Sequence, residues 1–259
     1  MASQDKSCLG ILDFDREPGW VRPTPRPGSL MSPQTYGCPV LIENVRGATI
    51  DATLRGAPEI VPAYIAAARK LVKQGAIAVG SNCGFAIRYQ AAVAAAVNVP
   101  VMLSTLVLLP SLLRQFPPDA QIGVCTADAT LFAEDLLGIN DPAERARIVV
   151  GGIEGGNMSR NASMNRPTEP EELEEDVASC VERLRMAHPR IRALLFSCTS
   201  FPVITPAIRD RFGLPVYDIS TACRLALESA VSIGLVHAPQ GSSCWRGDGS
   251  LAVTAADRG

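Results

Sequence analysis

Two short apolar runs, each ending at a polar cluster with a cysteine, constrain the fold of this chain most strongly. The first run, AIAVGSNCGF, contains Cys83, and the second, IRALLFSCTSF, contains Cys198. The two cysteines lie 115 positions apart, and the same offset relates the Val-Pro-Val at 99–101 to the Leu-Pro-Val at 214–216. Matches at one offset in separate places indicate an internal repeat.

Each run is rich in Ala, Val, Ile and Leu and does not alternate with polar residues, which is typical of a strand buried on both faces of a parallel sheet. A helical pattern precedes each run, over 61–74 and 171–186, and a helix and a second short strand are expected after it. This order predicts an α/β fold with two pseudo-symmetric lobes of the flavodoxin-like or Rossmann-like kind, each with a parallel sheet.

The repeat also gives the expected domain organisation. The run CLGILDF near the N-terminus and the run QIGVC at 121–125 are predicted to be corresponding first strands of the two lobes. We expect a first lobe over 1–113, a second lobe over 114–219 and a closing helix over 220–236. The remaining residues, 237–259, are expected to form a disordered tail.

The strand ends predict the place of the functional site. In open parallel α/β sheets, binding and reactive groups collect beyond the carboxyl ends of the strands. We therefore expect Cys83 and Cys198 to face each other across a cleft between the lobes. Helix starts after the cysteines offer backbone amides for a thiolate and for a substrate carboxylate. The candidate substrate-binding residues beside the cysteines are Asn82, Gly84, Phe85, Thr199 and Ser200.

At these motifs the chain resembles the aspartate/glutamate racemase superfamily, which also holds hydantoin racemases, maleate isomerases and arylmalonate decarboxylases. The sequence CTSFP, which begins at Cys198, is similar to the Cys-Thr-His-Phe-Pro of glutamate racemases, with Ser200 in place of the histidine. The sequence CGF at Cys83, with Gln90 and VPVMLSTLVLLP, resembles a subgroup that includes the algal dimethylsulfoniopropionate lyases. The resemblance extends over about 9–231, and it implies that the helix over 220–236 packs on the first lobe and completes it.

Asp13 ends the predicted strand beside the Cys83 strand. The resemblance implies an aspartate near this place that assists the first cysteine, so Asp13 is a candidate catalytic residue that orients Cys83. Asp15 is a weaker candidate for this role. A purely structural reading, in which Asp13 caps a loop, is an open alternative.

Two loops are candidate lids. The segment 17–39 carries six prolines and three glycines, which is long for an ordinary connection and typical of an active-site lid. In it, Thr35 is a candidate substrate-binding residue, with turn formation as its alternative. The segment 154–170 is expected to be a loop or second lid. The sequence TADAT is expected to lead into a helix at 131–137, and its Thr126 is a further candidate anion-binding residue, or an ordinary cap.

Composition limits the classes of function. The chain is 47% hydrophobic with a net charge of −2, and its basic residues do not cluster, which argues against nucleic acid as a partner. The apolar stretch at 91–113 is interrupted by Asn98, Pro100 and Pro110, so we expect no membrane span. Eight widely spaced cysteines and no secretory leader favour reduced thiols in a cytoplasmic protein. Two histidines and no glycine-rich phosphate motif predict neither a metal nor a nucleotide cofactor.

Two thiols at facing strand ends suit proton transfer at a carbon next to a carboxylate, where one group removes a proton and the other can return one. The leading interpretation is a cofactor-independent racemase or isomerase of a small carboxylic or amino acid. A lyase of the dimethylsulfoniopropionate type, with one cysteine as base, is the alternative that the resemblance implies. A two-lobed binding protein without catalysis is the third hypothesis. The expected partner is a small carboxylate substrate, and association of the chain with copies of itself is left open.

Overall fold

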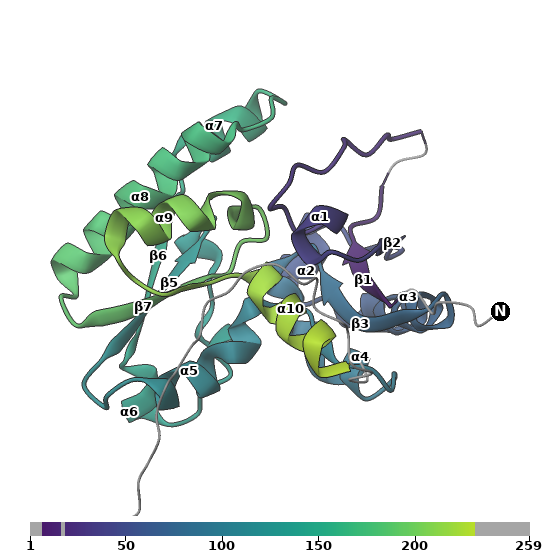
Figure 1. Cartoon of the computed structure of the whole chain (residues 1–259), viewed down its shortest axis with the longest axis horizontal. Helices are drawn as coiled ribbons and strands as arrows, with labels where there is room; N and C mark the ends of the chain where they lie inside the picture. The colour runs from purple at the N-terminus through teal and green to yellow at the C-terminus, as the bar shows by residue number, and fades with distance from the viewer. Residues whose placement is uncertain (1–6, 17–18, 231–259) are drawn as a thin grey trace, which may run out of the picture.

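The computed structural model describes residues 7–16 and 19–230, so the expected tail and the expected helix end at 231–236 lie outside the described residues. It contains two four-stranded parallel sheets, which confirms the predicted two-lobed α/β fold (Figure 1). The first sheet has the order β2-β1-β3-β4, with β1 (Cys8–Asp13), β2 (Val40–Asn44), β3 (Ala76–Ser81) and β4 (Val101–Met102). The second has the order β6-β5-β7-β8, with β5 (Gln121–Thr126), β6 (Ile148–Gly152), β7 (Ile191–Phe196) and β8 (Val216–Tyr217).

Helices connect the strands, as parallel pairing requires. The α-helices are α1 (Pro33–Tyr36), α2 (Ile50–Arg55), α3 (Val61–Lys73), α4 (Gln90–Ala94), α5 (Leu109–Gln115), α6 (Pro142–Arg145), α7 (Asn157–Ser163), α8 (Pro170–Ala187), α9 (Thr205–Phe212) and α10 (Ile219–Ala230). Short 3₁₀-helices are η1 (Pro58–Ile60), η2 (Gly84–Tyr89), η3 (Thr105–Leu108), η4 (Ala129–Leu131), η5 (Glu134–Leu137) and η6 (Phe201–Ile204).

The internal repeat is visible in the register of the sheets. Where β1 pairs with β3, the register shifts between Cys8 and Leu9. Where β5 pairs with β7, it shifts between Gln121 and Ile122, which is the corresponding place. The two lobes therefore share a local irregularity as well as a strand order.

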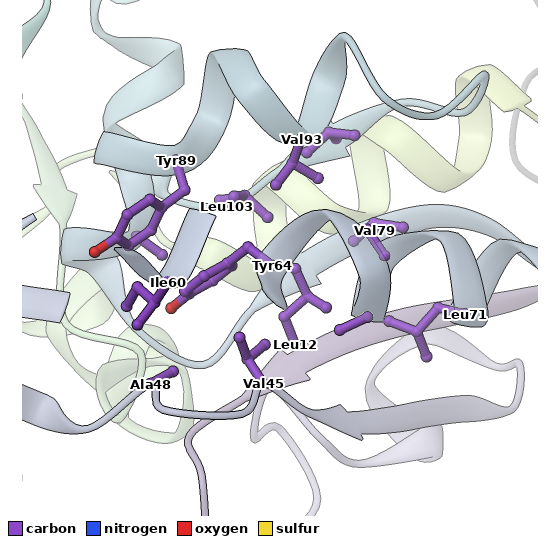
Figure 2. Close-up of a cluster of buried hydrophobic side chains, with 14 of the residues drawn as sticks. Leu12, Val45, Ala48, Ile60, Tyr64, Leu71, Val79, Tyr89, Val93 and Leu103 are labelled. Atoms are coloured by element: carbon purple, nitrogen blue, oxygen red, sulfur yellow. The ribbon is translucent and has the colours of Figure 1, made fainter. Parts of the chain in front are cut away.

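One face of each sheet is covered by helices of its own lobe. On the first sheet, Tyr64 and Leu71 of α3 pack against Leu12 and Val79, and the ring of Tyr64 stacks on that of Tyr89 at 4.4 Å between centroids (Figure 2). On the second sheet, α8 and α9 cover the corresponding face. Burial of these apolar side chains is the main stabilising contribution to each lobe.

The other face of the first sheet is covered by α10, from the end of the described chain. Ala222 and Ala226 of α10 pack in one buried cluster with Ile11 of β1 and Ala78 of β3. Figure 1 shows α10, in yellow-green, beside the strands of the first lobe. The first sheet is thus completed only by a helix that follows the whole second lobe.

The other face of the second sheet is covered in turn by α5, which follows β4 of the first lobe. Leu109 and Leu112 of α5 lie in one cluster with Val124 of β5 and Leu195 of β7. The expected boundary after residue 113 leaves most of this helix in the first lobe by sequence, whereas its packing is with the second. The lobes therefore exchange equivalent helices.

Three local predictions differ from the structure. The helix expected at 131–137 is replaced by η4 and η5, because the chain is extended at Phe132 between them. The loop expected at 154–170 contains α7, whose first amides, from Asn157 and Met158, donate to the carboxylate of Asp176 on α8 at 2.9 and 2.8 Å. Part of the loop expected at 17–39 is α1, whereas residues 19–32 run without regular structure.

Candidate active site

Cys83 is placed by the end of β3. The Asn82 amide donates to the carbonyl of Leu12 at 2.8 Å, so the strand pairing extends up to the residue before the cysteine. Cys83 itself is extended, with φ −153° and ψ 120°, and the 3₁₀-helix η2 begins at the next residue. The thiol of Cys83 therefore lies at the start of η2, as the sequence predicts.

Cys198 is placed in the same way at the end of β7. The Ser197 amide donates to the carbonyl of Cys125 at 2.9 Å, which repeats the bond made at the end of β3. The turn that follows leads into η6, with the N–H of Phe201 donating to the Cys198 carbonyl at 3.3 Å.

The two cysteine loops meet across the lobes in a reciprocal pair of contacts. The hydroxyl of Thr199 donates to the side-chain carbonyl of Asn82 at 3.3 Å. Gly84 lies directly against the carbonyl of Ser197. The 115-residue offset carries Asn82 onto Ser197 and Gly84 onto Thr199, so each loop presents the same two positions to the other, as in a two-fold symmetric interface. Cys83 and Cys198 lie between these contacts, on either side of the pseudo-two-fold axis.

Both cysteines line one cavity of about 340 Å³ between the lobes. Four positions named from the sequence, Asn82, Gly84, Phe85 and Thr126, also line it. So do Thr199 and Ser200, and the cavity wall adds Phe14, Asp128 and Met158, which the sequence alone did not indicate. The first two of these follow strand ends, which is the signal that would have suggested them.

Both thiols have raised pKa values. Burial raises the pKa of the Cys83 thiol to about 12, and the backbone N–H groups of Phe85 and Ala86 offset part of this effect. The neighbouring Cys198 raises it further, because two thiolates would repel each other. Burial also raises the pKa of the Cys198 thiol, against hydrogen bonds from the backbone and side chain of Ser200. Burial therefore favours the neutral form of both thiols.

Asp13 makes its side-chain hydrogen bonds with other residues than the two cysteines, and one of them holds Asn82, the residue before Cys83. Its Oδ1 accepts from Asn82 Nδ2 at 2.8 Å and from Arg16 at 3.3 Å, and its Oδ2 accepts from Arg22 at 2.6 Å. Burial would raise the pKa of this carboxyl, but hydrogen bonds from Asn82 and Arg22 and the Arg22 charge hold it below its usual range. Asp13 is thus a buried carboxylate that joins Asn82 to the 19–32 segment.

A second pocket of about 500 Å³ adjoins the cysteine cavity and lies beneath the 19–32 segment. Its wall includes Trp20, whose ring is stacked by the guanidinium groups of Arg16 at 4.4 Å and Arg22 at 5.2 Å. Arg26 of the same segment is paired with Glu169 at the start of α8 at 2.7 Å. The segment therefore bridges both lobes over the pocket; the sequence suggested a lid here but not these arginines.

Thr35 is the predicted site residue that the structure does not bring to the others. Its hydroxyl donates to the carbonyl of Ser29 at 2.7 Å, and its carbonyl accepts from Arg224 on α10 at 3.0 Å. Neither cavity has Thr35 in its wall. Asp15 likewise lies outside both walls and accepts from the Gly47 amide at 2.7 Å, which is a loop contact.

The sequence of the chain is similar to those of known enzymes. A dimethylsulfoniopropionate lyase of Durusdinium sp. clade D is 30% identical over 220 residues, which are 82% of this chain and 71% of the relative. The chain belongs to the dimethylsulfoniopropionate lyase family. Dimethylsulfoniopropionate lyases 5 and 3 of Emiliania huxleyi are 29% and 27% identical, and the chain spans 34% and 60% of their lengths. No protein-family profile matches the chain.

Solved structures show the same fold at lower identity. A cysteine-substituted arylmalonate decarboxylase with sulfate is 18% identical at a TM-score of 0.56, covering 86% of this chain and 92% of that one. Glutamate racemase from Francisella tularensis is 12% identical at a TM-score of 0.50, covering 87% and 81%. An aspartate racemase homologue from Pyrococcus horikoshii is 15% identical at 0.50, covering 86% and 98%. This dimethylsulfoniopropionate lyase family member thus has the two-lobed racemase fold.

Two further features of the described residues concern membranes and metals. Over 7–16 and 19–230, the helices are too short or too polar for one of them to span a bilayer. In the same ranges, His, Cys, Asp and Glu side chains do not gather in groups of three or more that could hold a metal ion.

Proposed function

We propose that this chain is a lyase of dimethylsulfoniopropionate, or of a close β-sulfonio carboxylate, that uses a cysteine thiolate as its base. One observation carries the proposal: the two cysteines from the repeated strand ends line a single cavity in a chain that belongs to this family. A volume of about 340 Å³ is suited to a small carboxylate. The chain spans 71%, 34% and 60% of the lengths of the three lyases that it matches.

The reaction follows from the groups in the cavity. The thiolate takes a proton from the carbon next to the carboxylate and becomes a thiol. The electron pair of the broken C–H bond forms the carbon–carbon double bond, and the C–S bond to the sulfonium breaks with its pair on sulfur. Dimethyl sulfide and acrylate are the products, and the thiol returns its proton to water. The atoms, charges and electrons balance without a cofactor.

A cationic substrate also explains how a thiol of raised pKa becomes a base. The described wall of the cysteine cavity holds no lysine, arginine or histidine that could favour a thiolate. A sulfonium brought into the cavity supplies the missing positive charge and lowers the pKa of the adjacent thiol. In this proposal the substrate activates the residue that attacks it.

Cys198 is the better candidate for the base. The backbone and side chain of Ser200 both donate to the Cys198 sulfur and favour its thiolate. The Cys83 thiol, with its pKa raised to about 12, receives only backbone N–H groups and is more suited to positioning the substrate or returning a proton. Its neighbour Asn82 is held by Asp13, which fixes the Cys83 loop.

A racemase is a second candidate, and the reciprocal contacts of the cysteine loops favour it. Two thiols on either side of a pseudo-two-fold axis can address opposite faces of one carbon, which is the geometry that inversion requires. The two activities differ in whether a leaving group is present on the β carbon. A non-catalytic binding role is disfavoured by membership of an enzyme family.

The proposal is tested by incubating the protein with dimethylsulfoniopropionate and with single enantiomers of small amino and hydroxy acids in deuterated water, followed by NMR. A lyase gives acrylate and dimethyl sulfide signals, whereas a racemase gives deuterium at the α carbon with inversion. The lyase proposal is rejected by inversion of a substrate without elimination from the sulfonium compound. The double variant C83S/C198S is the matched control and should give neither signal.

A further inference from the structure

The two adjoining cavities carry opposite charges. The charged side chains in the described wall of the 500 Å³ pocket are Arg16, Arg22 and Arg26, with no acidic residue among its lining. The charged side chain in the described wall of the cysteine cavity is Asp128. A ligand that extends from one cavity into the other therefore meets positive charge at one end and negative charge at the other.

The arginine pocket keeps a net positive charge after its internal pairs are counted. Arg26 is neutralised by Glu169. Arg16 and Arg22 share one carboxylate, that of Asp13, so one positive charge is unbalanced. The Nε of Arg16 is buried and has no hydrogen-bond partner in the described part of the chain, so protein acceptors do not satisfy the whole guanidinium group.

The cysteine cavity is suited to a cation. Asp128 accepts the amide and hydroxyl of Thr130 on one carboxylate oxygen, at 2.8 and 2.6 Å, which fixes its side chain at the wall. The rings of Phe14 and Phe85 lie in the same wall, and aromatic faces attract cations that have been stripped of water. A sulfonium or ammonium with methyl groups is both cationic and apolar, which matches this combination.

The cavities meet at the cysteine loops, because Asn82, Thr199 and Ser200 line both. We propose that the site binds one zwitterion across this meeting point, with its carboxylate in the pocket of Arg16 and Arg22 and its cationic group beside Asp128. The inference rests on the proposed function and adds the orientation of its substrate. It places the carbon between the two charged groups at the level of the thiols.

Two half-ligands test the orientation without turnover: propionate for the anionic end and trimethylsulfonium for the cationic end. Binding of each is measured by calorimetry, and propionate also by the emission of Trp20 in a Trp245→Phe protein, since the chain has two tryptophans. Arg16→Gln should weaken propionate by about tenfold or more, the effect of a charge-assisted hydrogen bond, and leave trimethylsulfonium unchanged. Asp128→Asn, which keeps an oxygen to accept from Thr130, should weaken the binding of trimethylsulfonium and leave that of propionate unchanged.

The control is Arg69→Gln, because Arg69 is exposed on the outer face of the first lobe and donates to the carbonyl of Ala96. It should leave both affinities unchanged. The two half-ligands should also bind together, whereas mutual displacement would contradict two separate subsites. The inference is overturned if each of the variants Arg16→Gln and Asp128→Asn weakens the binding of both probes equally. It is also overturned if neither variant weakens the binding of either probe. If Arg16→Gln cleaves dimethylsulfoniopropionate with an unchanged KM, the proposed orientation is rejected and the lyase proposal stands. If the half-ligands bind as predicted but the protein does not cleave dimethylsulfoniopropionate, the lyase proposal is rejected and the two subsites stand.

Discussion

Gly84 of the first lobe packs so closely on the carbonyl of Ser197 in the second lobe that a Cβ at position 84 would overlap the oxygen and crowd the carbonyl carbon at 3.0 Å. This contact sets the separation of the two cysteine loops. The obstacle is backbone, which cannot turn aside as a flexible side chain can. Glycine at position 84 is therefore required by the approach of the lobes.

The first prediction is that Gly84→Ala pushes the loops apart and lowers kcat by about a hundredfold, because misplacement by about 1 Å has effects of this size. Turnover and thermal unfolding are measured together. The matched control is Gly213→Ala, at a helix end with φ +62° and open space around it, where the substitution costs only about 1 kcal/mol of backbone strain. Equal activity losses in the two variants would mean that position 84 acts through stability alone.

The second prediction concerns the division of labour between the thiols. Cys198→Ser should abolish elimination, by a factor of about 10³ or more, because a hydroxyl is a far weaker base than a thiolate. Cys83→Ser should keep measurable elimination with an altered KM. If the protein is a racemase, each variant instead loses inversion and keeps α-proton exchange in one enantiomer. Full activity in both variants would reject every thiol mechanism and leave the cysteines as core residues.

The third prediction is that Asp13→Asn lowers kcat without unfolding the protein, because Asn82 loses an anionic acceptor and shifts the Cys83 loop. The unfolding free energy should fall by about 3 kcal/mol, the scale expected when a buried charge loses its partner. Kinetics and denaturant unfolding are measured side by side. Unchanged turnover in a destabilised variant would return Asp13 to a purely structural role.

The depressed pKa of Asp13 gives the fourth prediction, a dependence of stability on pH. The folded state holds the carboxylate more strongly than the unfolded chain does, so its contribution is fully present above the unfolded pKa of about 3.9. It is lost as the pH falls below that value and through the lower pKa of the folded state. Unfolding free energy against pH should therefore drop more steeply in the wild type than in Asp13→Asn over this acid range, and parallel curves would contradict the prediction.

The fifth prediction is that the cationic substrate lowers the pKa of the base. The rate constant kcat/KM reports the free enzyme, whose thiols have raised pKa values, and kcat reports the enzyme with substrate bound. Both kcat and kcat/KM should rise with pH. The apparent pKa of the rise in kcat should be lower than that of the rise in kcat/KM by about one pH unit or more. Profiles with the same apparent pKa would show that the sulfonium does not activate the thiol.

The strands and the cysteine positions could be predicted because buried parallel strands leave contiguous apolar runs, and because a repeat aligns Cys83 with Cys198. The hydrogen bonds of Arg22 and Asn82 to the Asp13 carboxylate could not be predicted, since Arg22 lies in a proline-rich segment that has no periodicity. The prediction of a helix at 131–137 was wrong, because an apolar pattern does not show that Phe132 is extended. The partner of α5 was also hidden, because an apolar stripe shows that a helix packs but not on which sheet. The place of α10 was expected only from the family resemblance.

The exchange of α5 and α10 has a consequence for synthesis on the ribosome. The strands of the first sheet are complete at Met102, but the helix that covers their second face begins at Ile219. The nascent chain therefore carries an uncovered apolar sheet until the second lobe has been made. Such a surface is a binding site for chaperones and a starting point for aggregation. The first lobe can therefore complete its folding only after the second lobe has been synthesised.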